Sequence, residues 1–254
     1  MKSVYGPVAS WRLGKSLGVD PICSERKICS FDCVYCQLRR GIKTYERREF
    51  ISLEKLKEDL KLIKDAEADV ITFSGTGEPT LAINLGSMIN YVRNVSDLPL
   101  AILTNSSFLS DAKVRDILYK LDIVVAKLDA SNEQVFKEIN QPHRKITFKK
   151  YLEGINTFRE NYSGKFALQI MFINRNKGYA QEIAGLAEDF KPDEIQINTP
   201  LRPCAVKPLS KEEIQEIKRY FSDSKKVITV YEGERPDVNP IDLEEILKRK
   251  RPKP

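Results

Sequence analysis

Apolar residues recur along most of the chain with two periods, one typical of helices and the other of strands. Leu53, Leu56, Leu60 and Ile63 lie three or four residues apart, as on the buried face of an amphipathic helix. The same spacing predicts helices over 85–95, 147–160 and 179–190, one after Ser110, and one after a Ser210–Glu213 capping box. Short apolar runs predict strands over 69–73, 100–104, 123–128, 165–173, 194–198 and 226–231. This alternation indicates a parallel sheet with helices on its outside.

Polar residues alternate with apolar ones within several of these strands. Lys127 and Asp129 share one face of their strand, opposite Val124, Ala126 and Leu128. The same alternation places polar side chains on one face at Thr72, Ser74, Gln169, Gln196 and Asn198. Strands covered on both faces in an open sheet are nearly all apolar, whereas the inner face of a barrel borders a lumen. We therefore expect a polar, ligand-holding lumen in which Lys127 pairs with Asp129 or with an acidic group of a substrate. Polar strand ends that pack against loops are the alternative.

The length of 254 residues suits one large α/β domain or two smaller ones. No linker interrupts the repeated units, so we expect a core domain over 1–232, then a turn-rich linker and a short basic tail over 233–254. We expect the basic residues 248–251 to be solvated. There is no apolar run of the roughly eighteen residues that a membrane span needs, and no signal-peptide pattern, so we expect a cytoplasmic location and no membrane partner. The net charge of +6 is compatible with an anionic partner.

Four of the five cysteines lie between positions 23 and 36, which indicates metal binding or catalysis. Cys29, Cys33 and Cys36 have the spacing C-x3-C-x2-C. Three thiolates can bind three irons of a [4Fe–4S] cubane, and the fourth iron then stays open, so that S-adenosylmethionine (SAM) can chelate it through its amino and carboxylate groups. A structural zinc site that includes Cys23 is the alternative, but the two separated cysteine pairs typical of such sites are absent from the sequence.

This cysteine motif, with Tyr35 just before its last cysteine, resembles that of the radical SAM superfamily. From about Tyr5 to Thr229 the chain also resembles the stand-alone iron–sulfur oxidoreductases related to the wybutosine-synthesising tRNA enzyme. The segments that carry this resemblance include 5–8, 12–19, 74–80, 103–105, 127–130, 139–143 and 198–200. It implies an α/β fold, a partial (β/α)6 TIM-like barrel with the cluster on the loop after the first strand. It also implies one [4Fe–4S] cluster, SAM, and an electron donor such as ferredoxin or flavodoxin.

The resemblance also names candidate residues for binding SAM. Thr76, Gly77 and Glu78 occupy the place of the superfamily's Gly-Gly-Glu motif, which binds the SAM ammonium group, although Thr76 departs from that pattern. Glycines expose backbone carbonyls at a strand end, and a carboxylate suits a cation. Tyr35 is expected close to the SAM adenine. Polar residues at strand ends or on lumen faces are candidates for the SAM ribose and carboxylate: Asn105, Asp129, Gln169 and Asn198. Lys127 and Asp129 are the candidate catalytic residues.

The substrate stays open at this point. Wybutosine-type enzymes carry further cysteines upstream that hold a second cluster, whereas here only Cys23 precedes the motif. We expect a single-cluster enzyme whose 5′-deoxyadenosyl radical abstracts hydrogen from an RNA or a small molecule, with Cys23 and Cys204 as free thiols. A glycyl-radical-type activase that acts on a protein is one alternative, and a non-catalytic iron–sulfur or zinc module is another.

Two further features are less informative. The segment Arg12–Gly18 lacks Walker spacing, so we expect close backbone packing near the cluster rather than a phosphate loop. His143, the only histidine, follows a proline, and we expect a loop residue rather than a catalytic base.

Overall fold

The computed structural model describes residues 1–61, 66–221 and 226–249. Within these residues the main sheet has eight strands: β1 Val4–Ser10, β2 Gly14–Val19, β5 Val70–Phe73, β6 Leu100–Thr104, β7 Ile123–Lys127, β8 Lys165–Met171, β9 Glu194–Asn198 and β10 Lys226–Thr229. They lie side by side in that order. β1 and β2 pair antiparallel, and all other neighbouring strands pair parallel. The predicted parallel sheet is confirmed, with one antiparallel strand added at its edge.

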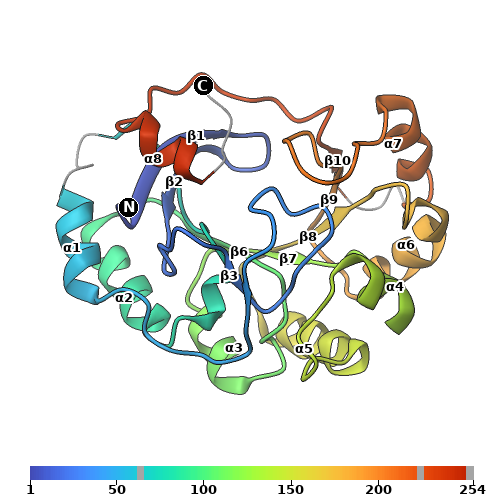
Figure 1. The fold of residues 1–254 in the computed structure, drawn as a ribbon, viewed down its shortest axis with the longest axis horizontal. Coiled ribbons are helices and arrows are strands. Elements are labelled where there is room, and N and C mark those ends of the chain that lie inside the picture. Colours follow the sequence, from blue (N-terminus) through green and yellow to red (C-terminus); the bar gives the residue numbers. More distant parts are fainter. Residues whose placement is uncertain (62–65, 222–225, 250–254) are drawn as a thin grey trace.

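Helices form the crossovers between consecutive parallel strands. They are α1 Leu53–Lys61, α2 Leu85–Val95, α3 Ala112–Leu118, α4 Glu133–Ile139, α5 Phe148–Asn161, α6 Ala180–Asp189 and α7 Lys211–Lys218. Figure 1 shows the strands as an arc with these helices along its outer side, which is the partial barrel that the sequence predicts. Ile63, predicted on the first helix, lies outside the described residues. Among the described helices, none has the length and apolar character needed to cross a membrane.

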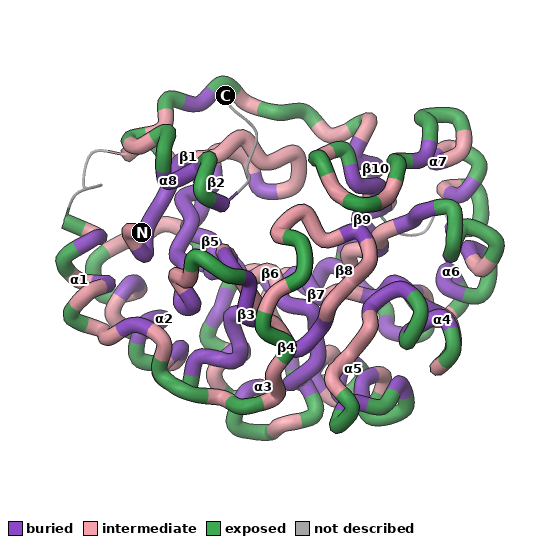
Figure 2. The backbone as a smooth tube through the Cα atoms, viewed as in Figure 1, coloured by how far each residue is buried: buried purple, intermediate pink, exposed green. Residues whose placement is uncertain are grey.

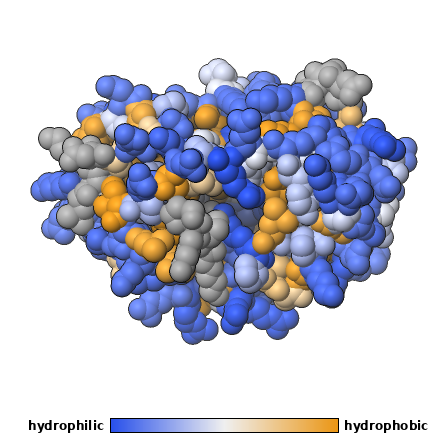
Figure 3. Space-filling model, turned by 90° about the horizontal axis from the view of Figure 1, so that it is seen from above, coloured by the Kyte–Doolittle hydropathy of each residue, from blue (hydrophilic) through white to orange (hydrophobic). Residues whose placement is uncertain are grey.

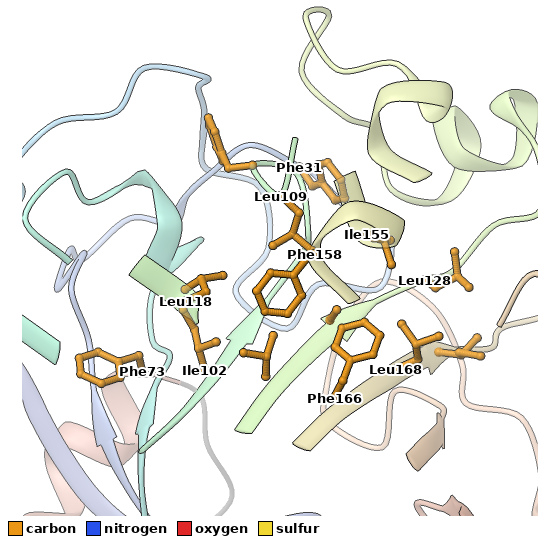
Figure 4. Packing of buried hydrophobic residues seen from close by; sticks show 14 of the residues in the cluster. Phe31, Phe73, Ile102, Leu109, Leu118, Leu128, Ile155, Phe158, Phe166 and Leu168 are labelled. Atoms are coloured by element: carbon orange, nitrogen blue, oxygen red, sulfur yellow. The ribbon is translucent and has the colours of Figure 1, made fainter. Parts of the chain in front are cut away.

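The main core lies between the helices and the outer face of the sheet. Figure 4 shows Phe73, Ile102 and Phe166 on the strands facing Leu118 and Phe158 on the helices. All five side chains are fully buried, and Figure 2 shows the buried stretches concentrated on the strands. Complete burial of a large apolar side chain contributes about 1.5–3 kcal/mol to folding. The outer face of the sheet is therefore sealed by helices, and ligands must reach the inner face.

The N-terminal segment differs from its prediction. Instead of backbone packed near the cluster, the stretch Arg12–Gly18 forms the turn and second strand of the β1–β2 hairpin. Gly14 has a φ of +72° at the start of β2, and a side chain there would meet the Asp69 carboxylate. β2 is the first parallel strand, and the cysteine loop follows it directly, as expected.

The segment after β10 returns to β1 along the open side of the arc (Figure 1). Gly233 packs against Trp11, and the Ile241 N–H donates to the Gly6 carbonyl over 2.9 Å. Helix α8, Leu243–Lys248, then lies beside β1. The prediction of a solvated basic tail is wrong for Arg249, whose side chain is completely buried. Lys250 and Arg251 lie outside the described residues.

Candidate functional site

The motif cysteines lie on one loop beyond the C-terminal end of β2. A two-residue strand, β3 Ile28–Cys29, pairs with β4 Ile42–Lys43, and Ile28 also bridges to Gly77. Phe31 is almost completely buried and packs edge-on against Phe136, with ring centroids 5.3 Å apart. The loop is thereby anchored in the core, while its cysteines stay half-buried near the inner face of the sheet.

Nitrogen donors point at two of the three sulfurs. Cys29 Sγ accepts from the Phe31 N–H and from Asn105 Nδ2, each over 3.4 Å, and Cys33 Sγ accepts from Asn140 Nδ2 over 3.6 Å. Burial raises the pKa of both thiols, to about 11 for Cys33. Iron binds the thiolate, so cluster binding must release these protons, and N–H donors stabilise the charge that results.

The donor set fits a cluster better than a single ion. In the part of the chain that the structure describes, no three His, Cys, Asp or Glu side chains converge as they would around one metal ion. A cubane distributes its three protein thiolates over three different irons, so the sulfurs need not meet at one point. Cys29, Cys33 and Cys36 would hold such a group, with Asn105 and Asn140 beside its sulfurs.

A second segment, 139–143, clamps the cysteine loop. The Val34 N–H donates to the Ile139 carbonyl over 3.0 Å, and the His143 N–H donates to the Ser30 carbonyl over 2.8 Å. The His143 ring stacks on Tyr45 with centroids 5.8 Å apart, so His143 is a loop residue, as expected. Burial and the neighbouring cations lower its pKa.

Gly77 and Thr76 join the cysteine loop to the end of β5. A Cβ at Gly77 would lie only 1.8 Å from the Ile28 carbonyl oxygen, so no other residue fits without a shift of backbone. The Thr76 hydroxyl donates to Asp20 over 3.0 Å and accepts from the Ser24 N–H over 3.0 Å. The departure from a Gly-Gly-Glu pattern therefore has a structural reason, because the Thr76 side chain ties two loops together.

Glu78 is nearly fully buried and accepts hydrogen bonds from the chain itself. Its Oε2 accepts from the Asn105 N–H over 2.7 Å, and its Oε1 accepts from the hydroxyls of Thr80 and Thr104, each over 2.7 Å. Burial raises the pKa of Glu78, although these hydrogen bonds oppose the rise. The carboxylate links the ends of β5 and β6 directly below the cysteine loop.

Asp129 is the centre of a buried polar network. It accepts from the Met171 N–H over 2.8 Å, from Asn140 Nδ2 over 2.7 Å, and from the Tyr35 hydroxyl. Lys127 Nζ lies 3.7 Å from the same carboxylate and 5.2 Å from the centroid of the Tyr35 ring. Burial and the Asp129 charge raise the pKa of Tyr35 well above its usual value. The predicted pairing of Lys127 with Asp129 is confirmed.

A cavity of about 290 Å³ lies on the inner face of the sheet, next to the cysteine loop. Polar residues predicted to face a lumen line it, together with the loop residue Tyr35: Thr72, Ser74, Gln169 and Asn198. The space-filling view in Figure 3 shows a hollow near the middle of one face, with strongly hydrophilic residues beside it. Gln196 instead donates to Glu194 over 2.8 Å and does not line the cavity. Thr76, Gly77, Glu78, Asn105 and Asp129 surround the cysteine loop rather than the cavity.

Three residues of the site have no role in the sequence-based prediction. Asn140 contacts both Cys33 and Asp129, and Asp20 binds Thr76. Arg249 forms a fully buried ion pair with Asp20, with Nε and Oδ2 3.1 Å apart. The segment that contains Asn140 appeared only as part of a family resemblance, and no local pattern links Asp20 with Arg249.

Comparisons with known proteins agree with this geometry. Residues 27–187 match the family model described as the Radical SAM superfamily. A UPF0026 protein of Methanocaldococcus jannaschii is 40% identical over 234 residues, 88% of this chain and 72% of that protein. A longer protein of Brachyspira hyodysenteriae, named GTPase Obg, is 37% identical over 230 residues, 87% of this chain but 33% of that protein. The solved structure of Streptococcus suis SuiB bound to S-adenosylmethionine has a TM-score of 0.64 at 15% identity, over 85% of this chain and 50% of SuiB, which shows a shared fold.

Proposed function

Because this chain belongs to the radical SAM superfamily and is an enzyme of that class, we propose that it cleaves SAM reductively at one [4Fe–4S] cluster on Cys29, Cys33 and Cys36. When bound, these cofactors supply a 5′-deoxyadenosyl radical, which abstracts hydrogen from an RNA or a small-molecule substrate. The observation that carries the proposal is the single loop with three cysteines, which borders a polar cavity and in which the sulfurs of Cys29 and Cys33 accept hydrogen bonds from nitrogen donors.

The residues around the loop have separate proposed roles. Asn105 and Asn140 stabilise the charge on the cluster sulfurs, because they already donate to Cys29 and Cys33. Buried Lys27, paired with Asp32, adds a positive charge beside the loop. Gln169 and Asn198 line the cavity and are proposed to bind the SAM ribose and carboxylate, with Tyr35 near the adenine. Thr76, Gly77 and Glu78 are proposed to bind the SAM ammonium group through backbone carbonyls and the Glu78 charge.

Lys127 and Asp129 are the proposed catalytic pair. The Asp129 side chain is fully buried, whereas 15% of the Lys127 side chain is exposed. Asp129 compensates the lysine charge and orients Tyr35, so the Lys127 ammonium is held in place as a proton donor to a reacting group. A buried ammonium without such a partner would be costly.

The reaction consumes one electron for each SAM cleaved, so we propose a low-potential donor such as ferredoxin or flavodoxin. The motif cysteines must be reduced before they bind iron. A reducing compartment such as the cytoplasm meets that need, and we propose that the enzyme works there.

The proposal is tested by anaerobic reconstitution followed by reduction with dithionite. We expect the wild type to convert SAM to 5′-deoxyadenosine, measured by liquid chromatography and mass spectrometry. Cys29→Ala, Cys33→Ala and Cys36→Ala each remove an iron ligand and should abolish the product. Cys23→Ala and Cys204→Ala are matched controls and should retain it. Normal turnover in any motif variant would overturn the assignment of the cluster ligands. If the wild type formed no product, the protein would be a non-catalytic binding module instead of an enzyme.

A further inference from the structure

The lumen cavity extends far beyond the cysteine loop. Tyr35 and Gln37 of the loop line one end, and Trp11, Arg12 and Arg235 also line it. β2 starts at Gly14 and runs toward the cysteine loop, so the β1–β2 turn lies at the opposite end of the sheet. The six residues of β2 span about 20 Å at a rise of about 3.3 Å each. The cavity therefore has two ends, one at the cysteine loop and the other at the β1–β2 turn.

The charge of the cavity lining is entirely positive. Arg12, Arg202 and Arg235 line it, and within the described part of the chain none of its lining residues is Asp or Glu. Arg202 Nη1 donates to Gln37 beside the cysteine loop over 2.9 Å, whereas Arg12 lies over the Trp11 ring in the turn. SAM itself carries a net positive charge, from its sulfonium and ammonium groups less its carboxylate. The turn end of the cavity is therefore matched to a different, anionic molecule.

Hydroxyl groups add to the donors at that end. Ser10 Oγ accepts from the N–H groups of Arg12 and Leu13 over 3.3 and 3.2 Å, so its own hydrogen is available to donate to a ligand. Ser16, whose hydroxyl lies 2.8 Å from that of Thr72, also lines the cavity. Guanidinium forks match the oxygens of a phosphate in pairs, and two arginines balance a dianion.

We propose that Arg12 and Arg235 bind a phosphate group of the substrate, so that the substrate is a phosphate ester. That the bound molecule is the substrate attacked by the radical rests on the proposed function. The phosphate belongs either to a free nucleotide-sized molecule or to an RNA strand. In both cases it anchors the substrate at the turn, and the remainder extends toward the cysteine loop.

The test uses the reconstituted holoprotein with SAM bound, under anaerobic conditions. Isothermal titration measures the binding of ribose 5-phosphate, of ribose as the uncharged control, and of a short single-stranded oligoribonucleotide. We expect a phosphate probe to bind and ribose to bind far more weakly. Arg12→Gln and Arg235→Gln, each made separately, should weaken the binding of the phosphate probe at least tenfold. Arg219→Gln, at an exposed arginine beyond α7, is the matched control and should change nothing.

Each result of the titrations either supports or overturns the proposed phosphate site. Arginine-dependent binding of ribose 5-phosphate supports a small phosphorylated substrate, and arginine-dependent binding of the oligoribonucleotide alone supports a phosphate within RNA. Equal binding in wild type and both arginine variants, or no binding of either phosphate probe to wild type, overturns it. Arg235 is exposed, so its substitution tests the site even if Arg12→Gln fails to fold. The 5′-deoxyadenosine assay on wild type separates the two proposals, because arginine-dependent binding without SAM cleavage refutes the enzyme reaction but retains the phosphate site.

Discussion

Three buried carboxylates, Asp20, Glu78 and Asp129, fix the backbone around the cysteine loop. Asp20 accepts from the N–H groups of Thr76 and Cys23 over 3.0 and 2.9 Å. Glu78 and Asp129 accept in the same way from backbone groups at the ends of neighbouring strands. Charged acceptors of this kind make the stronger class of hydrogen bond. Glu78 and Asp129, which the sequence predicts as ligands of SAM, thus also set the shape of the site, together with Asp20.

Gly77→Ala tests whether the close approach of Gly77 to Ile28 is needed for the cluster. The added methyl group would lie 1.8 Å from a backbone oxygen, so the cysteine loop must move. We expect the iron content after reconstitution and the yield of 5′-deoxyadenosine both to fall. Gly185→Ala, on α6 with nothing within 4 Å, is the matched control and should keep both. A fully iron-loaded Gly77→Ala protein would contradict the expectation.

Glu78→Ala separates the structural role of this carboxylate from a role in binding SAM. The variant leaves the Asn105 N–H and the Thr104 hydroxyl without their acceptor, which costs about 1–3 kcal/mol of stability. We also expect SAM affinity to fall, by a few kcal/mol at most, while cluster content is kept. Equilibrium SAM binding and iron content are measured on the same samples. If cluster loading collapses and SAM affinity in the remaining holoprotein is unchanged, Glu78 is purely structural.

At the scale of elements, regular periodicity made most of the fold predictable. The helix predicted over 85–95 is α2, and the strand predicted over 100–104 is β6, each with those bounds. The β1–β2 hairpin was not predicted, because Gly6, Pro7 and Gly14 interrupt its apolar pattern and its pairing register shifts between Tyr5 and Val8. Helices α4 and α8, with seven and six residues, were not predicted either.

The residues of the candidate site likewise fall into those that the sequence could predict and those that it could not. The motif Cys29–Cys36 is local, so its spacing was enough to predict which cysteines would bind a cluster. Asn140 lies 107 residues from Cys33, and Arg249 lies 229 residues from Asp20. Such pairs form only when strands and helices are assembled, so a single sequence gives no sign of them.

Helix α8 is expected to stabilise the end of the sheet that carries the cysteine loop, through Arg249 just after the helix. Its guanidinium binds Asp20 and Glu245, and Asp20 in turn holds Thr76. Removing one partner of a buried ion pair typically costs about 3–5 kcal/mol. We expect Arg249→Met to lower the thermal midpoint and also to weaken SAM binding in the folded holoprotein.

The neighbouring Lys248→Met is the matched control, because Lys248 is exposed on the same helix and its pair with Glu245 is only partly buried. It should leave the thermal midpoint almost unchanged, because an ion pair of an exposed lysine contributes little to stability. An Arg249→Met protein with unaltered stability and SAM affinity would show that α8 is not coupled to the site.

At the scale of the whole molecule, the two ends of the described chain meet beside the sheet edge. The Lys2 N–H donates to Glu245 over 3.0 Å, and Arg249 donates to the Lys2 carbonyl over 2.6 Å. Together with the segment after β10, these contacts border the open side of the arc, opposite the helix-covered face. The partial barrel thus has one covered face and one side bordered by its terminal segments, and the cavity lies between them.

The whole chain is expected to hold a single cluster. Two cysteines remain outside the motif, and each already has a local contact: Cys23 Sγ with the Met1 carbonyl over 3.5 Å, and Cys204 Sγ with the Val206 carbonyl over 3.2 Å. Burial, followed by the charge of Asp20, raises the pKa of Cys23 to about 11, much as burial does for Cys33, so the number of ligands rather than the pKa decides the matter. A second cubane needs three or four protein ligands, which these two residues cannot supply.

Iron counting on reconstituted protein tests this expectation. We expect about four irons per chain, one cubane, in both the wild type and the Cys23→Ala, Cys204→Ala double variant. Cys29→Ala serves as the opposite control, because it removes a motif ligand and should lose iron. A wild-type value near twice that number, halved in the double variant, would show a second cluster. The chemistry of the enzyme would then have to include a co-substrate held at that second cluster.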